Sequence, residues 1–239
     1  MSLSINRLGM LIDGGRYADA AQLGRAMKTI RLGYACLNTI LRAQKPTVFC
    51  SRTCRLATAK EKGQQYLFQL GLANARDILT MLTWNEEHGI RFMRLSSGIL
   101  PFASHPEVGY EVSAVPGLAA ILQEVGQMGQ TLGHRLTMHP GQFCQLASPR
   151  MEVFTNAVRE LRYHCDILNA IGLGPDSVMI IHMGGVYGDK EATLARFVER
   201  WKLVPADIQA RIVLENDEIC YSVSDLLPDA LTRLKYSQQ

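Results

Sequence analysis

The chain lacks a membrane-spanning segment, because no apolar run approaches the roughly 18 residues that such a segment needs. It also lacks a strong charge of one sign, since its formal net charge is only +3. The net charge therefore gives no indication of a nucleic-acid partner, although a local basic groove would not be visible in the net charge. We expect a protein with no membrane partner.

The chain also lacks a disulfide framework. Its six cysteines are scattered, and no secretory signal precedes them. Only Cys50 and Cys54 lie close together in sequence, and they lack the second pair that a structural zinc site needs. We therefore predict reduced thiols and a cytoplasmic protein.

A glycine-rich dinucleotide fingerprint is missing after the first predicted strand, so we expect no nucleotide cofactor. What the sequence does contain is an alternation of strand-like and helix-like segments without hairpin signals. The predicted strands are Ile30–Leu37, Ile90–Leu95, Leu136–His139, Ser177–His182 and Arg211–Leu214. The predicted helices are Tyr66–Glu87, Pro116–Met128, a helix opened by Ser148-Pro149 and running to Ile171, Asp189–Trp201 and Ser222–Leu234, while residues 43–61 are expected to be irregular.

This order predicts an α/β fold with parallel strands. A doubly wound sheet and a TIM-barrel-type (β/α) fold both fit, although about five βα units are too few to close an eight-unit barrel. With 239 residues, of which 47% are hydrophobic, the chain is long enough for one large α/β domain. We assign residues 29–239 to a partial barrel and residues 1–28 to an N-terminal extension.

Metal-ligating side chains follow the ends of the predicted strands. His139 and His182 close the third and fourth strands, Glu215 follows the fifth, and His105 lies in the loop after the second. In a parallel α/β fold these ends share one edge, where active sites form. Three imidazoles and a carboxylate suit a divalent metal such as Zn²⁺, Mn²⁺ or Fe²⁺, which would polarise an oxygen or activate water.

Other polar residues favour ordinary roles. His88, His134 and His164 are interpreted as surface or packing residues, because none follows a strand end. The basic loop around Arg52 and Arg55 could contact phosphates, but most basic loops are simply solvated.

Several motifs, in order, resemble the UV damage endonucleases over about residues 30–227. They are L-G-Y-A-C-L-N, W-N-E-E-H-G-I-R-F-M-R-L-S-S, L-P-F-A-S-H-P, L-T-M-H-P-G-Q-F, I-I-H-M-G-G-V-Y-G-D-K and L-E-N-D-E. The resemblance implies a TIM barrel that nicks damaged double-stranded DNA 5′ to UV photoproducts. It also implies bound divalent metals, above all Mn²⁺, with Zn²⁺ or Mg²⁺ as alternatives.

The resemblance assigns roles to named positions. His105, His139, His182 and Glu215 match the family's metal ligands and catalytic centre. Gln142 and Phe143 match a glutamine and an aromatic residue that wedge into the duplex, where the aromatic residue is usually tyrosine. Tyr34 and Asn38 match positions that line the lesion pocket.

The chain departs from the family pattern beyond its fifth strand. The further βα units and metal ligands of the family have no counterpart here, so we expect a truncated barrel. Two alternatives stay open. One is a metal-dependent sugar isomerase or epimerase of the same fold, and the other is a non-catalytic remnant that binds DNA or metal.

Overall fold

The computed structural model describes residues 32–217 and 219–226. The chain divides into the units Met1–Leu32 and Gly33–Gln239, and of the first unit only Leu32 is described. The predicted extension at residues 1–28 therefore lies outside the described residues.

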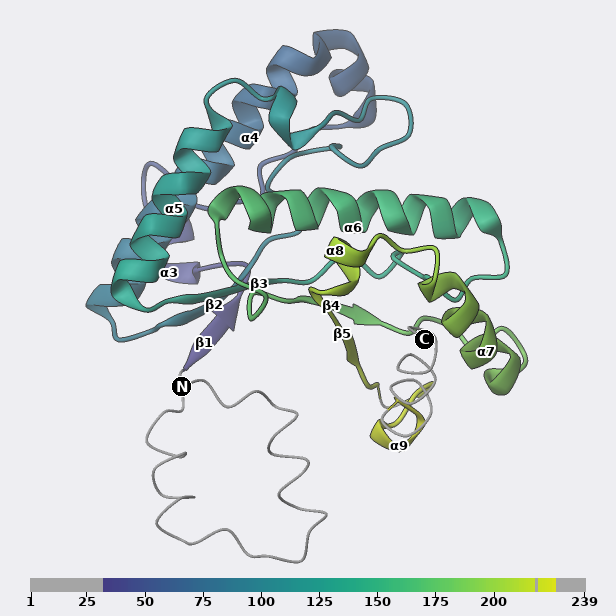
Figure 1. The fold of residues 1–239 in the computed structure, drawn as a ribbon. Coiled ribbons are helices and arrows are strands. Elements are labelled where there is room, and N and C mark those ends of the chain that lie inside the picture. Colours follow the sequence, from purple (N-terminus) through teal and green to yellow (C-terminus); the bar gives the residue numbers. More distant parts are fainter. Residues whose placement is uncertain (1–31, 218, 227–239) are drawn as a thin grey trace, which may run out of the picture. The chain divides into compact units, whose positions relative to one another are not determined.

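A parallel sheet of five strands forms the centre of the second unit (Figure 1). The strands are β1 (Gly33–Ala35), β2 (Phe92–Leu95), β3 (Arg135–Met138), β4 (Met179–His182) and β5 (Ile212–Glu215). Their order in the sheet is their order along the chain. A doubly wound sheet would reverse its strand order at a switch point, so the observed order favours the barrel-type alternative. The predicted α/β fold of TIM-barrel type, with five strand–helix units, is confirmed.

Helices connect the strands. They are α3 (Thr39–Ala43), α4 (Leu56–Glu87), the 3₁₀ turn η1 (Val112–Ala114), α5 (Leu118–Leu132), α6 (Met151–Ile171), α7 (Lys190–Trp201), α8 (Ala206–Gln209) and α9 (Val223–Asp225). The prediction that residues 43–61 are irregular holds for residues 44–55 and was wrong from residue 56 on, because α4 begins at Leu56. Its first two turns are mostly exposed and lack an apolar stripe, and Gly63, at φ 71°, interrupts the regular helix. Periodicity alone therefore missed these turns.

Two further helix ends differ from the prediction. Helix α6 begins at Met151, and the Ser148 hydroxyl accepts a hydrogen bond from the Arg150 backbone N–H at 3.3 Å instead of capping the helix. Helix α9 does begin after Ser222, whose backbone N–H donates to the Asp225 carboxylate at 2.7 Å. The predicted continuation of α9 beyond Leu226 lies outside the described residues.

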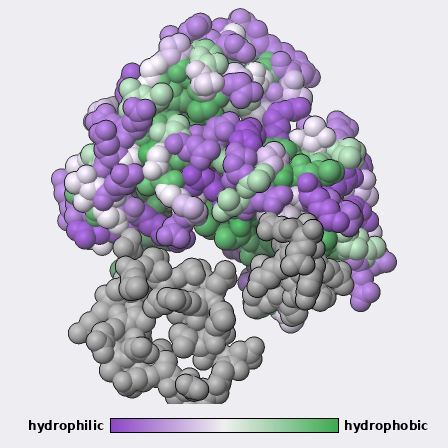
Figure 2. Space-filling view, viewed as in Figure 1, coloured by the Kyte–Doolittle hydropathy of each residue, from purple (hydrophilic) through white to green (hydrophobic). Residues whose placement is uncertain are grey.

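The hydrophobic core lies between the sheet and helices α4, α5 and α6, which cover one of its faces (Figure 1). Helices α5 and α6 approach closely at Gly126, where an added Cβ would lie 1.7 Å from the Ile171 carbonyl oxygen. Hydrophilic residues cover most of the visible face of the described part (Figure 2). Among the described residues, no helix is long and apolar enough to cross a membrane.

Candidate metal centre at the carboxyl ends of the strands

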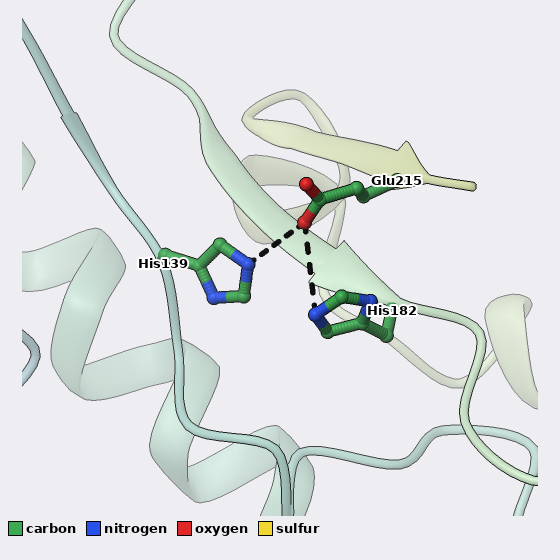
Figure 3. A group of neighbouring side chains, drawn as sticks. All are labelled: His139, His182 and Glu215. Carbon is green, nitrogen blue, oxygen red and sulfur yellow. Dashed lines mark hydrogen bonds and ion pairs between the residues drawn. The ribbon is translucent and has the colours of Figure 1, made fainter. Parts of the chain in front are cut away.

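Three of the four predicted metal ligands meet at the carboxyl edge of the sheet (Figure 3). His139 directly follows β3, while His182 and Glu215 are the last residues of β4 and β5. The Glu215 Oε2 atom lies 2.9 Å from the His139 Nε2 atom and 3.6 Å from the His182 Nε2 atom. Ligand atoms bound to one ion, each at about 2.0–2.2 Å from it, lie at similar separations.

The hydrogen bonds of His139 favour a cation at this point. Its Nδ1 atom lies 2.9 Å from the Pro140 carbonyl oxygen, which can only accept, so we assign the Nδ1 proton to this bond. If Nδ1 carries the only proton of the ring, the Nε2 atom has a lone pair that faces a carboxylate oxygen. Two such acceptors are stable at this distance only with a proton or metal ion between them. A backbone carbonyl that holds the far nitrogen is also the usual support of a metal-binding imidazole.

The three side chains are accessible from solvent. The exposed fractions are 16% for the His139 side chain, 42% for His182 and 44% for Glu215. The nearby Asp217 carboxylate accepts hydrogen bonds from the backbone N–H groups of Cys220 and, at 2.8 Å, of Ile219. These bonds lower the pKa of Asp217, which keeps a second negative charge beside the cluster. The site is thus open and can accept a cation and a ligand.

His105 lies outside this group of three. Its Nδ1 atom accepts a hydrogen bond from the Glu107 backbone N–H at 3.1 Å, and its ring meets the Phe102 ring edge-on with centroids 5.8 Å apart. Phe102 itself has φ 61°, a conformation that non-glycine residues seldom adopt. The assignment of His105 as a metal ligand remains a prediction.

The loop that carries His105 is held by two helices. The fully buried Asn74 of α4 donates to the Ile99 carbonyl at 2.9 Å. Tyr163 of α6 accepts from the Leu100 backbone N–H at 2.9 Å. Burial raises the pKa of Tyr163, so its phenol stays protonated. These positions were missed in the sequence analysis, although an asparagine between two alanines on an apolar helix face is a usable signal for a buried loop anchor.

The predicted lesion-pocket residues make structural contacts in this unit. The Tyr34 hydroxyl donates to the Asn85 side chain of α4 at 2.9 Å. Asn38 is buried and caps α3, because its Oδ1 atom accepts from the Ile40 and Leu41 backbone N–H groups at 3.1 Å and 3.0 Å. Tyr34 is the middle residue of β1 and Asn38 follows the end of this strand, and their role toward DNA stays a prediction.

The predicted wedge residues lie beside the metal centre, in the turn that follows His139. The Cys144 backbone N–H closes this turn on the Gly141 carbonyl at 2.9 Å. Gln142 and Phe143 are exposed, and the Phe143 side chain reaches 81% exposure. An aromatic ring this exposed contributes little to the stability of the fold and is accessible to a partner.

Arg52 and two histidines outside the metal centre have local partners or surroundings. Arg52 pairs with Asp77 at 2.6 Å and also donates to the Phe49 carbonyl at 2.8 Å, so its guanidinium holds its own loop. His164 is fully buried, and its burial lowers its pKa, so the ring is neutral. His88 stacks on Trp84 at 3.8 Å between ring centroids. All six cysteines are free thiols, as predicted.

Comparison with known proteins agrees with this geometry. The family model described as UV-endonuclease UvdE matches residues 30–231. The UV-damage endonuclease of Neurospora crassa is 47% identical over 83% of this chain and 35% of its own length. For the UV-damage endonuclease of Schizosaccharomyces pombe, identity is 48% over 83% of this chain and 33% of the relative.

A solved structure also resembles this chain. The crystal structure of SacUVDE superposes with a TM-score of 0.75 and 30% identity, covering 87% of this chain and 66% of that chain. The chain thus spans about a third of the length of the two fungal relatives. Since the family model matches most of the chain, from the first strand to beyond the fifth, the chain belongs to the UV-endonuclease UvdE family.

Proposed function

We propose that this chain is the metal-binding and DNA-binding part of a repair endonuclease, which nicks the phosphodiester backbone 5′ to UV photoproducts. The observation that carries the proposal is the cluster of His139, His182 and Glu215 at the carboxyl edge of the sheet. Two imidazole nitrogens that face the same carboxylate oxygen suit a divalent metal ion. We expect Mn²⁺ first, with Zn²⁺ or Mg²⁺ as alternatives.

The protein's own residues would divide the work in the following way. The His139 Nε2, His182 Nε2 and Glu215 Oε2 atoms would hold the cation, and the Pro140 carbonyl would keep the His139 ring in the required tautomer. A bound divalent metal supplies Lewis-acid activation of water and neutralises charge on the scissile phosphate. Solvent exposure of the cluster would let a DNA backbone reach it.

The substrate assignment rests on the turn that follows His139. Phe143 is exposed beside the metal centre and would enter the base stack at the lesion, with Gln142 next to it. Unstacking costs least where the duplex is already distorted, so an aromatic wedge selects damaged DNA. Phenylalanine at this position retains the stacking surface of tyrosine and lacks only the hydroxyl.

A nicking assay tests the proposal. A duplex with one defined UV photoproduct is incubated with the protein and Mn²⁺, or with a chelator. We expect a cut 5′ to the lesion that needs the metal, disappears in His139→Ala and persists in the matched control His88→Ala, whose ring is exposed and stacked on Trp84. An uncut lesion duplex with folded, Mn²⁺-bearing protein would contradict the proposed activity for this chain.

A further inference from the structure

The turn that carries Gln142 and Phe143 is tied to the loop that follows β4. The Gln145 Nε2 atom donates to the Gln142 carbonyl oxygen at 3.3 Å. The Tyr187 hydroxyl donates to the Oε1 atom of the same Gln145 side chain. One amide thus joins the exposed turn to a residue 42 positions further along the chain.

The same two loops also pack directly against each other. Gly184 has φ 94°, and a Cβ at this position would lie 3.2 Å from the Gln145 Cγ atom. A side chain on Gly184 would therefore push Gln145 away from its present place. The glycine lets the loop after His182 support the aliphatic part of Gln145 while Tyr187 binds its amide.

The Tyr187 end of this connection is anchored. The Val186 carbonyl accepts a hydrogen bond from the buried Thr193 hydroxyl of α7 at 2.8 Å, and the Tyr221 hydroxyl donates to the Gly185 carbonyl at 3.3 Å. Tyr187 itself has φ 51° and is 40% exposed. A left-handed backbone at a bulky residue is costly, and it persists where the surrounding structure requires it, as at functional sites.

The Phe143 end, in contrast, has few contacts of its own. Gly141, Gln142 and Phe143 are all exposed, and the next buried residue is Cys144. A short turn with an exposed aromatic tip samples several shapes unless something outside it limits them. A wedge that must unstack bases loses binding free energy if it first has to be ordered.

We propose that Gln145 and Tyr187 are positioning residues that hold the Gln142-Phe143 tip in the shape that enters damaged DNA. The inference rests on the proposed function for its DNA-binding part. The connection between Gln145 and Tyr187 can be tested on the free protein. We call the Gln145–Tyr187 connection the brace. Because Tyr187 lies on the loop that follows His182, the brace also couples the tip to the strand that carries a proposed metal ligand.

The first experiment measures cleavage by chymotrypsin after Phe143, by mass spectrometry, in the absence of DNA. Tyr187→Phe removes only the hydroxyl, and we expect cleavage to rise roughly three- to tenfold, the change expected from the loss of one hydrogen bond. The matched control is Tyr66→Phe, because Tyr66 lies on α4 and its ring contacts Lys62. An unchanged cleavage rate in Tyr187→Phe would overturn the proposal that Tyr187 holds the tip.

The second experiment is a double-mutant cycle on lesion DNA. The tip's entry is followed by 2-aminopurine fluorescence beside the photoproduct, and nicking is measured in parallel. Tyr187→Phe should lower both signals about threefold or more in the wild-type background and have no further effect in Phe143→Ala. Equal effects in both backgrounds would show a general structural role and overturn the positioning role.

The two experiments separate the possible failures. If the wild-type chain neither nicks nor raises the fluorescence, the proposed function fails, and the brace loses its DNA role even if chymotrypsin shows that it exists. If Phe143→Ala abolishes the fluorescence signal while Tyr187→Phe leaves it unchanged, the proposed function stands and the positioning role is wrong.

Discussion

The two edges of the sheet each hold a histidine–glutamate pair. The two pairs differ in the further side chain that contacts the glutamate. At the carboxyl edge, Glu215 lies 2.9 Å from His139, and its third neighbour is the His182 imidazole. At the amino edge, Glu86 lies 3.0 Å from His134, and its third neighbour is the Arg91 guanidinium at 2.6 Å. An imidazole offers a lone pair to a metal, whereas a guanidinium already neutralises the carboxylate.

The burial of the two pairs differs in the same direction. The exposed fractions are 0% for His134 and 27% for Glu86 at the amino edge, against 16% for His139 and 44% for Glu215 at the carboxyl edge. The third member there, His182, is 42% exposed. In barrels of this type the amino edge supports stability and the carboxyl edge supports function. The comparison shows that a histidine beside a glutamate does not by itself define a metal site. Whether such a pair can bind a metal depends on the third side chain beside it and on its access to solvent.

The largest expected effect is on stability and lies at the amino edge. Among the described residues the buried Arg211 has no carboxylate partner. It donates instead to four neighbours, namely the Asn169 side chain and the carbonyls of Leu173, Gly174 and Ser177, at 2.8–3.1 Å. Arg211→Met leaves these acceptors unpaired and should lower the free energy of unfolding by about 3 kcal/mol. Urea unfolding measures the change.

Arg135→Met provides the control for Arg211. Among the described residues, the more exposed guanidinium of Arg135 donates only to the Asp176 carbonyl and lies 5.4 Å from the Phe92 ring centroid. Its loss should therefore cost less than about 1 kcal/mol. The metal affinity of the folded protein should be unchanged in both variants. Equal costs for the two substitutions would show that the Arg211 contacts are not what stabilises the amino edge.

The next effect is on metal affinity and lies at the carboxyl edge. His182→Ala removes one of three donor atoms and should weaken Mn²⁺ binding on the order of 100-fold, since loss of even a supporting group costs 10–100-fold. Isothermal titration calorimetry measures the change. His134→Ala is the matched control and should leave Mn²⁺ affinity unaltered. Loss of affinity in His134→Ala, with His182→Ala unaffected, would reverse the comparison.

A smaller effect is expected for the loop anchor Asn74. Its side chain accepts from the Arg52 backbone N–H at 2.7 Å and donates to the carbonyls of Arg52 and Ile99 at 3.0 Å and 2.9 Å. Asn74→Ala should cost about 2 kcal/mol, because buried backbone groups lose their partner. Amide hydrogen exchange should rise in residues 97–105 and stay unchanged around His134. A uniform rise over the whole unit would contradict a local anchoring role.

The smallest effect concerns the pH dependence of the amino edge. The Arg91 guanidinium, followed by His134, holds the pKa of Glu86 below its ordinary value. A carboxyl group whose pKa is lowered by folding stabilises the protein above its unfolded pKa, and this contribution is lost as the pH falls through the folded pKa. Wild type should therefore exceed Glu86→Gln in stability at pH 7, and the difference should shrink toward acid pH. A difference that grows on acidification would contradict this sign.

The sequence predicted the residues that stand at the carboxyl ends of the strands and meet at one edge of the sheet. A histidine before a proline, a histidine closing an apolar run and a glutamate after the fifth strand were placed on one edge by parallel topology alone. The structure brings His139, His182 and Glu215 together, within the 4.8 Å separation of their ligand atoms. Strand order then favoured the barrel type over the doubly wound alternative.

What the sequence could not predict depends on contacts between distant loops. Gln145 and Tyr187 are 42 positions apart, and neither residue has an unusual local pattern. His105 lies in the loop after β2 and was a predicted ligand like the other three, yet its ring is turned toward Phe102 and the Glu107 backbone. The first turns of α4 escaped because they are polar and exposed, so no apolar period marks them.

The most direct test of the central claim is anomalous diffraction from crystals of this chain soaked in Mn²⁺. We expect an anomalous peak for a manganese ion held by the His139 and His182 Nε2 atoms and by a Glu215 oxygen, with no peak beside His134 and Glu86. Equal peaks at both edges, or a peak at the amino edge alone, would contradict it. So would a soaked crystal with no manganese at the carboxyl edge.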